Sequence, residues 1–311
     1  MQGLSISISN DITGRSSGTI SFGALIFNAY KTRVQAEGGT VENDACAIEF
    51  IKSLNPISSY GTYVDAMITQ ANALSYVLPP TATLTDLQNR LSTIGDTALN
   101  KLDVLHIYSP DASTIDFFTL NVVAPATIQA TLVNSPTSSK LGILTNGSNN
   151  YIDTGFDPYN DASNFTLDDN HFGLILSQSV GDLYVGGVRD NTGTDSAIAI
   201  GFLGSLNRDY SLNNNLSGIA TPANINAGYK VTQRVSSSGF KNYNDGVEIN
   251  TKSTASIRIP NVGNIFLGGW NNDGTINQFS TNRYAGFTIG ASLTTTEMAT
   301  ISTQITAFYG R

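Results

Sequence analysis

Short apolar runs separated by turn residues dominate the chain from about residue 115 onward. Gly, Asn, Asp and Ser cluster between the runs, at intervals typical of a sandwich or jelly roll. The dipeptide Asp245-Gly246 lies between two runs, and because glycine tolerates positive φ it predicts a hairpin turn. The pattern therefore predicts a mainly β, antiparallel sandwich with strands at residues 172–176, 183–188, 197–202, 229–235, 257–259, 265–268 and 285–289.

A helical period replaces this pattern between about residues 24 and 105. The first helical stretch follows Thr40, and its apolar face carries Ala47, Phe50, Ile51 and Leu54. A second runs from about residue 63 to residue 77 and ends before Pro79-Pro80, whose rings cannot continue a helix. A third starts near Thr83. The first third of the chain is therefore predicted to be mainly helical.

The last residues predict a terminal helix. Thr294 and Glu297 have the spacing of a capping box, in which the hydroxyl and the carboxylate accept from free backbone N–H groups. One face of the helix that follows carries Met298, Ile301, Ile305 and Phe308. We expect this face to pack on the sandwich.

The opposite end alternates Leu4, Ile6 and Ile8 with serines, which is the period of a half-buried strand. We interpret this segment as an arm that docks on a neighbour. The chain is thus predicted to comprise an N-terminal arm (1–22), a mainly helical anchoring module (23–110) and a β-sandwich with a C-terminal helix (111–311).

Composition narrows the classes of partner. The 311 residues include 16 Lys and Arg against 24 Asp and Glu, for a net charge of −8, which disfavours nucleic-acid binding because that depends on cations at phosphates. No run reaches the roughly 18 apolar residues of a membrane helix, so no membrane insertion is expected. The single cysteine, Cys46, is expected to be a buried, unreactive thiol.

Residues 147–158 (GSNNYIDTGFDP) and residues 265–274 (IFLGGWNNDG) are two motifs with the character of a family signature. The first resembles the opening, and the second a late strand and loop, of the concanavalin A-like (laminin-G type) domains of tailed-bacteriophage structural proteins. Residues 286–290 (GFTIG) and 292–297 (SLTTTE) resemble their last strand and closing helix. Residues 30–42 (YKTRVQAEGGTVE) resemble a segment that often precedes the sandwich.

The resemblance implies a concanavalin A-like jelly roll in a viral structural protein located in the virion, as a tail or tail-fibre component or a head decoration protein. Its expected partners are other virion proteins and further copies of the chain in a homo-oligomer, together with a host-surface glycan. The sequence begins without the pattern of a secretory signal, so we expect synthesis in the bacterial host cytoplasm. The alternatives are a soluble carbohydrate-binding lectin and, less favoured, a capsule-polysaccharide depolymerase.

Catalytic chemistry is not expected. Glycanases of this fold place paired carboxylates on one strand as Glu-x-Asp-x-x-Glu, and this motif does not occur in the sequence. The two glutamates of the predicted sandwich are Glu248, beside the hairpin, and Glu297, in the helix cap. His106 and His171 have no nearby Cys or His at metal-ligand spacing, so structural roles are favoured. The chain is predicted to be non-enzymatic.

The candidate ligand-binding residues are Trp270, Asn271, Asn272 and Asp273, because an exposed indole can stack on a sugar while amides and carboxylates bind hydroxyls. The favoured alternative is that Trp270 continues a core strand and the polar residues only turn the chain. No cofactor is predicted. Calcium would need oxygen ligands of the kind that Asp157, Asp161, Asp168 and Asp169 offer, but their spacing matches no calcium loop, and solvated turn acids are favoured.

Overall fold

The computed structural model describes residues 60–108, 113–178, 184–192, 194–203, 208–222 and 227–310. Residues 59–311 form one compact unit. The predicted arm (1–22), the helical stretch after Thr40, Cys46 and the segment 30–42 lie outside the described residues. The arm and the anchoring role of residues 23–110 therefore stay predictions.

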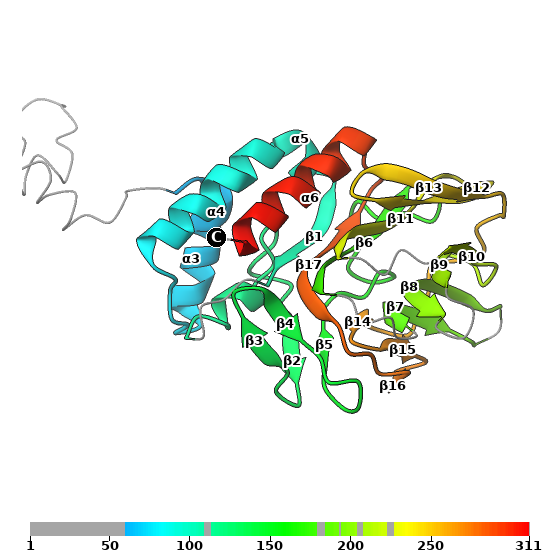
Figure 1. Cartoon of the computed structure of the whole chain (residues 1–311), viewed down its shortest axis with the longest axis horizontal. Coiled ribbons are helices and arrows are strands. Elements are labelled where there is room, and N and C mark those ends of the chain that lie inside the picture. The colour runs from blue at the N-terminus through cyan, green and yellow to red at the C-terminus, as the bar shows by residue number, and fades with distance from the viewer. Residues whose placement is uncertain are drawn as a thin grey trace, which may run out of the picture. The chain divides into compact units, whose positions relative to one another are not determined.

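The described chain is built on two β-sheets, almost entirely antiparallel (Figure 1). Sheet 1 has eight strands and sheet 2 has nine. In order, sheet 1 consists of β13 (Val247–Lys252), β12 (Gly239–Asn244), β11 (Gly228–Ser236), β6 (Asn170–Gln178), β17 (Arg283–Gly290), β4 (Gly142–Leu144) and β3 (Thr137–Ser139), with β1 (Leu102–Ile107) also paired to β17.

Sheet 2 consists, in order, of β10 (Ile219–Pro222), β9 (Arg208–Asn213), β8 (Ser196–Leu203), β7 (Tyr184–Asp190), β14 (Phe266–Leu267), β5 (Tyr151–Asp153) and β2 (Thr131–Val133). The hairpin of β15 (Trp270–Asn272) and β16 (Thr275–Asn277) joins this sheet because β15 pairs with β7, in parallel.

A core of apolar side chains fills the space between the sheets. Alternation along β6 directs Phe172, Leu174 and Leu176 into it, where they meet Ile198 and Ile200 of sheet 2. The predicted fold class, a mainly β antiparallel sandwich, is confirmed.

The predicted hairpin is confirmed. Asp245 has φ 50° and Gly246 φ 82°, so both central residues have the positive φ of a tight turn between β12 and β13. The predicted strand at residues 257–259 is wrong: this segment pairs with no strand among the described residues. Its backbone donates from Ile257 N to Asn214 O and accepts at the Arg258 carbonyl from the Ser196 hydroxyl, and Pro260, which has no N–H, follows it.

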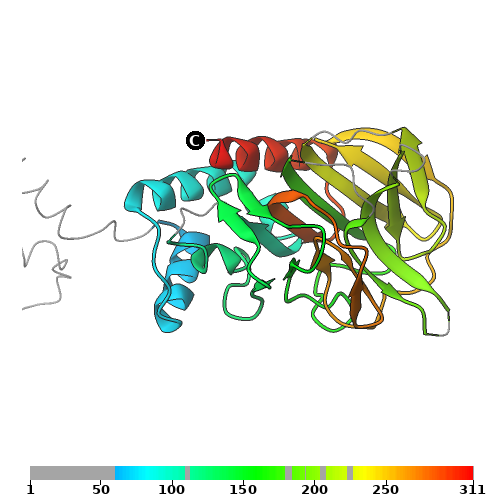
Figure 2. The same cartoon turned by 60° about the horizontal axis from the view of Figure 1, so that its bottom comes forward.

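Helices cover the outer face of sheet 1. They are α3 (Thr62–Ala73), α4 (Thr81–Ile94), α5 (Asp96–Leu99) and α6 (Thr295–Tyr309), and a 3-10 turn, η1 (Phe117–Thr119), lies beside β1. Figures 1 and 2 both show α6 running beside α4. None of the helices in the described ranges is long and apolar enough to cross a membrane.

The predicted packing of the C-terminal helix is confirmed. Met298, Ile301, Ile305 and Phe308 are all fully buried, in one cluster with side chains from β6, β11, β12, β17 and α4. The sandwich also includes residues upstream of the predicted boundary at residue 111, because β1 pairs with β17 from Leu102 to Ile107. The helical segment before β1 and the sandwich thus share a core.

Candidate functional site

The loop singled out in the sequence, residues 270–274, is a hairpin on sheet 2. Trp270 is 5% exposed and packs against Ala197, Ala199 and Leu212, and the Arg189 guanidinium carbon lies 5.8 Å from the centre of its ring. The small alanine side chains let the indole lie against the sheet. Its burial leaves the ring without an open face on which a sugar could stack, so the geometry gives Trp270 the structural role of the alternative interpretation.

The polar residues of this hairpin hold it in place. Asn271 is 1% exposed; its Nδ2 donates to the Asn264 carbonyl at 2.8 Å and its Oδ1 accepts from Gly274 N at 2.7 Å. Asp273 accepts from Asn191 N at 3.0 Å. Asn272 and Asp273 remain partly exposed, and their role in ligand binding stays a prediction.

The four candidate calcium ligands accept hydrogen bonds from their surroundings instead of converging. Asp157 Oδ1 accepts from Tyr159 N, and Asp161 Oδ2 accepts from Asp157 N. Asp168 accepts from the Ser256 hydroxyl, and Asp169 accepts from Ser292 N. In the part of the chain that the structure describes, no group of three acidic, His or Cys side chains is placed to hold a metal ion.

Both histidines are fully buried. His171 Nδ1 lies 2.6 Å from the Ala291 carbonyl and its Nε2 lies 3.1 Å from Thr288 Oγ1, which is also bonded to the Tyr229 hydroxyl. Burial lowers the pKa of His106 and of His171 to about 4 against the opposing effect of their hydrogen bonds, so both rings are neutral at pH 7. Neither is accessible to a substrate.

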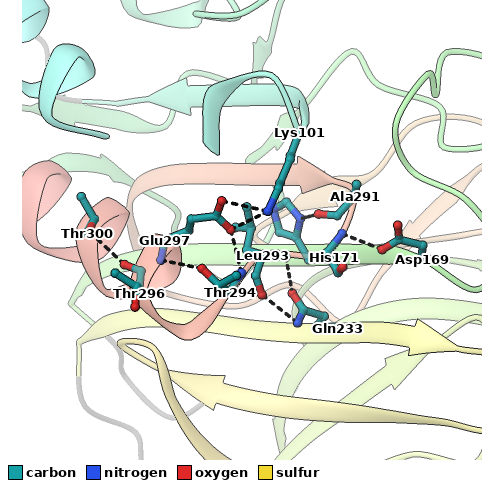
Figure 3. Close-up of polar contacts among 11 residues, drawn as sticks. Lys101, Asp169, His171, Gln233, Ala291, Leu293, Thr294, Thr296, Glu297 and Thr300 are labelled. Carbon is teal, nitrogen blue, oxygen red and sulfur yellow. Dashed lines mark hydrogen bonds and ion pairs between the residues drawn. The ribbon is translucent and has the colours of Figure 1, made fainter. Parts of the chain in front are cut away.

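A polar cluster at the start of α6 fixes this helix to sheet 1 (Figure 3). Lys101 Nζ lies 2.8 Å from each carboxylate oxygen of Glu297, and the predicted capping box between Glu297 and Thr294 is present. Burial acts to raise the pKa of Glu297, but the Lys101 cation and the Thr294 groups outweigh it and lower that pKa. Gln233 bonds both backbone groups of Leu293. The Lys101 and Gln233 contacts join other segments to the start of α6, which is a structural arrangement.

A different group of side chains on sheet 2 has the chemistry of a binding surface. We call it the Tyr151 patch, and it comprises Tyr151, Asp153, Asn264, Phe266 and Phe279. Because Ile152 and Leu267 point into the core, their neighbours Tyr151, Asp153 and Phe266 lie on the outer face of the sheet. The Tyr151 and Phe266 rings are 4.9 Å apart between centroids, and the Tyr151 and Phe279 rings are 6.5 Å apart.

Polar groups accompany these rings. Asp153 Oδ1 accepts from Asn264 Nδ2 and from Gly155 N, both at 2.9 Å, which fixes the carboxylate beside the rings. Burial, and then the nearby Asp153 charge, raise the pKa of Tyr151, so its hydroxyl stays protonated. Tyr151, Phe279, Asp153 and Asn264 are all partly exposed, and Phe266 is 9% exposed. The patch thus offers aromatic faces with a carboxylate and an amide.

Small residues continue the outer face beside the patch. In the strand register Phe266 lies opposite Gly187, and Gly187 lies opposite Ala199. Trp270 packs on Ala199, so the small residues beside the patch are covered by its indole. Residues 147–158 resemble a family motif, but Tyr151 was not predicted to be a site residue; the signal in the sequence is the alternation of Tyr151 and Asp153 around Ile152.

Comparisons with known proteins assign no family to the chain. No family model matches the chain, and no curated protein matches its sequence. A mutant Trypanosoma rangeli sialidase displaying trans-sialidase activity aligns with 74% of this chain and 39% of its own, at 11% identity and a TM-score of 0.49. The carbohydrate-binding module CBM40 of the Ruminococcus gnavus IT-sialidase, bound to α2,3 sialyllactose, aligns with 52% of this chain and 92% of its own, at 13% identity and a TM-score of 0.38.

The receptor-binding domain of botulinum neurotoxin D aligns with 66% of this chain and 52% of its own, at 6% identity and a TM-score of 0.44. The chain spans only about two fifths of the length of the sialidase it matches. None of these three structures is a phage protein. At such identities the likeness concerns the two-sheet β-sandwich and not a shared site.

Proposed function

We propose that this chain is a non-enzymatic binding protein whose β-sandwich recognises a glycan through the Tyr151 patch. The observation that carries the proposal is the partly exposed pair of rings, Tyr151 and Phe279, next to a carboxylate that Asn264 holds in place. Aromatic faces cover the apolar side of a sugar ring, while carboxylate and amide groups bind its hydroxyls. This is the carbohydrate-binding lectin that the sequence offered as an alternative. Its site residues are those of the Tyr151 patch and not residues 270–273.

The positions of Glu248, Glu297 and the two histidines favour binding over hydrolysis. Retaining glycosidases need two carboxyl groups about 5 Å apart. Glu248 is paired with Lys241 on the surface at 2.7 Å, and Glu297 is paired with Lys101 in the helix cap. Both histidines are buried. We therefore expect the protein to bind and release the glycan without cleaving it.

The test is binding of the full chain to a panel of immobilised oligosaccharides and bacterial surface polysaccharides, followed by titration of the best ligand. Tyr151→Ala and Phe279→Ala should each weaken binding about tenfold or more, which corresponds to about 1.4 kcal/mol. Tyr159→Ala is the matched control, because Tyr159 is 56% exposed and lies outside the patch. Binding that all three variants retain, or a panel without any ligand at millimolar protein, would overturn the proposal.

A role in a phage particle remains a second proposal, and the motifs at residues 147–158 and 265–274 are the observations that favour it. The ligand would then be a host-surface glycan, and the partners would be other virion proteins and further copies of the chain. Mass spectrometry of purified particles tests this role directly. Absence of the chain from the particles would overturn the phage role. It would leave the glycan proposal intact, because the Tyr151 patch can bind a glycan whether or not the chain is part of a particle.

A further inference from the structure

Strand β11 directs polar side chains into the space between the sheets. Tyr229 and Val231 face the helices, so the alternate residues Thr232 and Arg234 face sheet 2. Thr232 and Arg234 are both fully buried, as is Asn213 on the facing strand β9. A cation is therefore enclosed in the interior of the sandwich.

The Arg234 guanidinium is bonded to neutral groups. Its Nε donates to the Asn213 carbonyl and its Nη1 to the Thr254 carbonyl, both at 3.0 Å, and its Cζ lies 5.3 Å from the centre of the Phe240 ring. The Asp168 carboxylate is near enough for its charge to act on the guanidinium, but its hydrogen bond is accepted from the Ser256 hydroxyl. Burial lowers the pKa of Arg234, and the Asp168 charge opposes this.

Three side chains at this place have polar atoms without a partner. They are Arg234 Nη2, Thr232 Oγ1, and both Nδ2 and Oδ1 of Asn213. A buried polar group without a partner is strongly unfavourable, and an uncompensated buried charge is more so. Because both amide atoms of Asn213 lack partners, the amide can turn its NH2 toward the guanidinium without breaking a bond.

We propose that Arg234, Thr232 and Asn213 bind a small monovalent anion of halide size between the two sheets. All three supply N–H or O–H donors, and Arg234 supplies the positive charge, so an anion satisfies the donors and adds to the effect of the Asp168 charge on the cation. The Oδ1 atoms of Asn170 and Asn214 are also buried without a partner. They are acceptors, and they suit a water molecule that accompanies the anion. This site is separate from the Tyr151 patch and does not depend on the proposed function.

The first experiment measures thermal unfolding of the full chain in sodium bromide, sodium chloride and sodium gluconate at equal ionic strength. A ligand that binds only the folded state raises the melting temperature with the logarithm of its concentration. We expect this rise with bromide and chloride and not with gluconate, which is too large to enter. Crystals grown with bromide should show an anomalous peak between Arg234 Nη2, Thr232 Oγ1 and Asn213 Nδ2.

Two variants distinguish a bound anion from a general salt effect. Thr232→Val keeps the shape of the side chain and removes one donor, so the halide-dependent rise should shrink. Asn213→Asp places a carboxylate beside Arg234, so it should abolish the halide dependence while raising the melting temperature in gluconate. Equal melting temperatures of the unsubstituted chain in halide and gluconate, with only water in the bromide crystals, would overturn the proposal.

Discussion

The outer faces of the two sheets are used differently. On sheet 1, Ile175, Tyr229 and Val231 are buried beneath α6 and its neighbours, and the Lys101–Glu297 pair fixes the start of that helix. On sheet 2, the indole of Trp270 covers Ala197 and Ala199, but the rings of Tyr151 and Phe279 stay partly exposed. The first face contributes to stability, and the second leaves aromatic surface for a ligand. Substitutions on the outer face of sheet 1 should therefore reduce stability, and substitutions in the Tyr151 patch should reduce glycan binding.

Truncation after Leu293, which removes α6, should have the largest effect. Four fully buried side chains are lost, and each contributes roughly 1.5 to 3 kcal/mol, against a net stability of about 5 to 15 kcal/mol for a typical domain. We expect an insoluble or unfolded protein, measured by circular dichroism and soluble yield. A truncated protein that melts within a few degrees of the full chain would show that sheet 1 does not need α6 for its stability.

Trp270→Ala tests a buried position on sheet 2. The indole is 5% exposed, so its truncation should cost about 3 to 5 kcal/mol and lower the melting temperature by several degrees. Glycan affinity, measured below the new melting temperature, should be unchanged. Unchanged stability with lost binding would instead return residues 270–273 to the binding site.

The features that the sequence predicted are those that a few neighbouring residues determine. Asp245-Gly246 determines a turn by its backbone preferences, and Thr294 with Glu297 determines a helix start by local hydrogen bonds. The Tyr151 patch could not be predicted in this way, because Phe266 and Phe279 come from distant segments that meet Tyr151 only after the sheet forms. The period of β11 likewise shows that Thr232 and Arg234 share a face, but not that this face is the interior.

Stability should also depend on pH through the buried histidines. The pKa of His106 and of His171 is about 4 in the folded protein, against 6.5 for a free side chain, so the folded state binds protons less readily than the unfolded chain. Their stabilisation is complete above pH about 6.5 and is lost as the pH falls toward 4, by about 1.4 kcal/mol per pH unit for each ring.

Urea unfolding at pH 7.5, 6 and 5 measures this dependence. His171→Gln and His106→Gln should each remove one of the two contributions and flatten the slope. A free energy of unfolding that stays constant from pH 6.5 to pH 5 would contradict burial of a neutral His171 ring near the start of α6 and of a neutral His106 ring on β1.

Tyr151→Ala should have the smallest effect on folding. Tyr151 is partly exposed and contacts Phe266 and Phe279, so its loss should cost less than the about 3 to 5 kcal/mol of a buried ring. The measurement is the urea midpoint, with Tyr159→Ala as the control for removing an exposed tyrosine ring. Because glycan binding should fall about tenfold in the same variant, a small change in stability with a large change in affinity would place recognition on sheet 2. A loss of stability as large as that of Trp270→Ala would instead make Tyr151 part of the core and remove the basis for the distinction between the two faces.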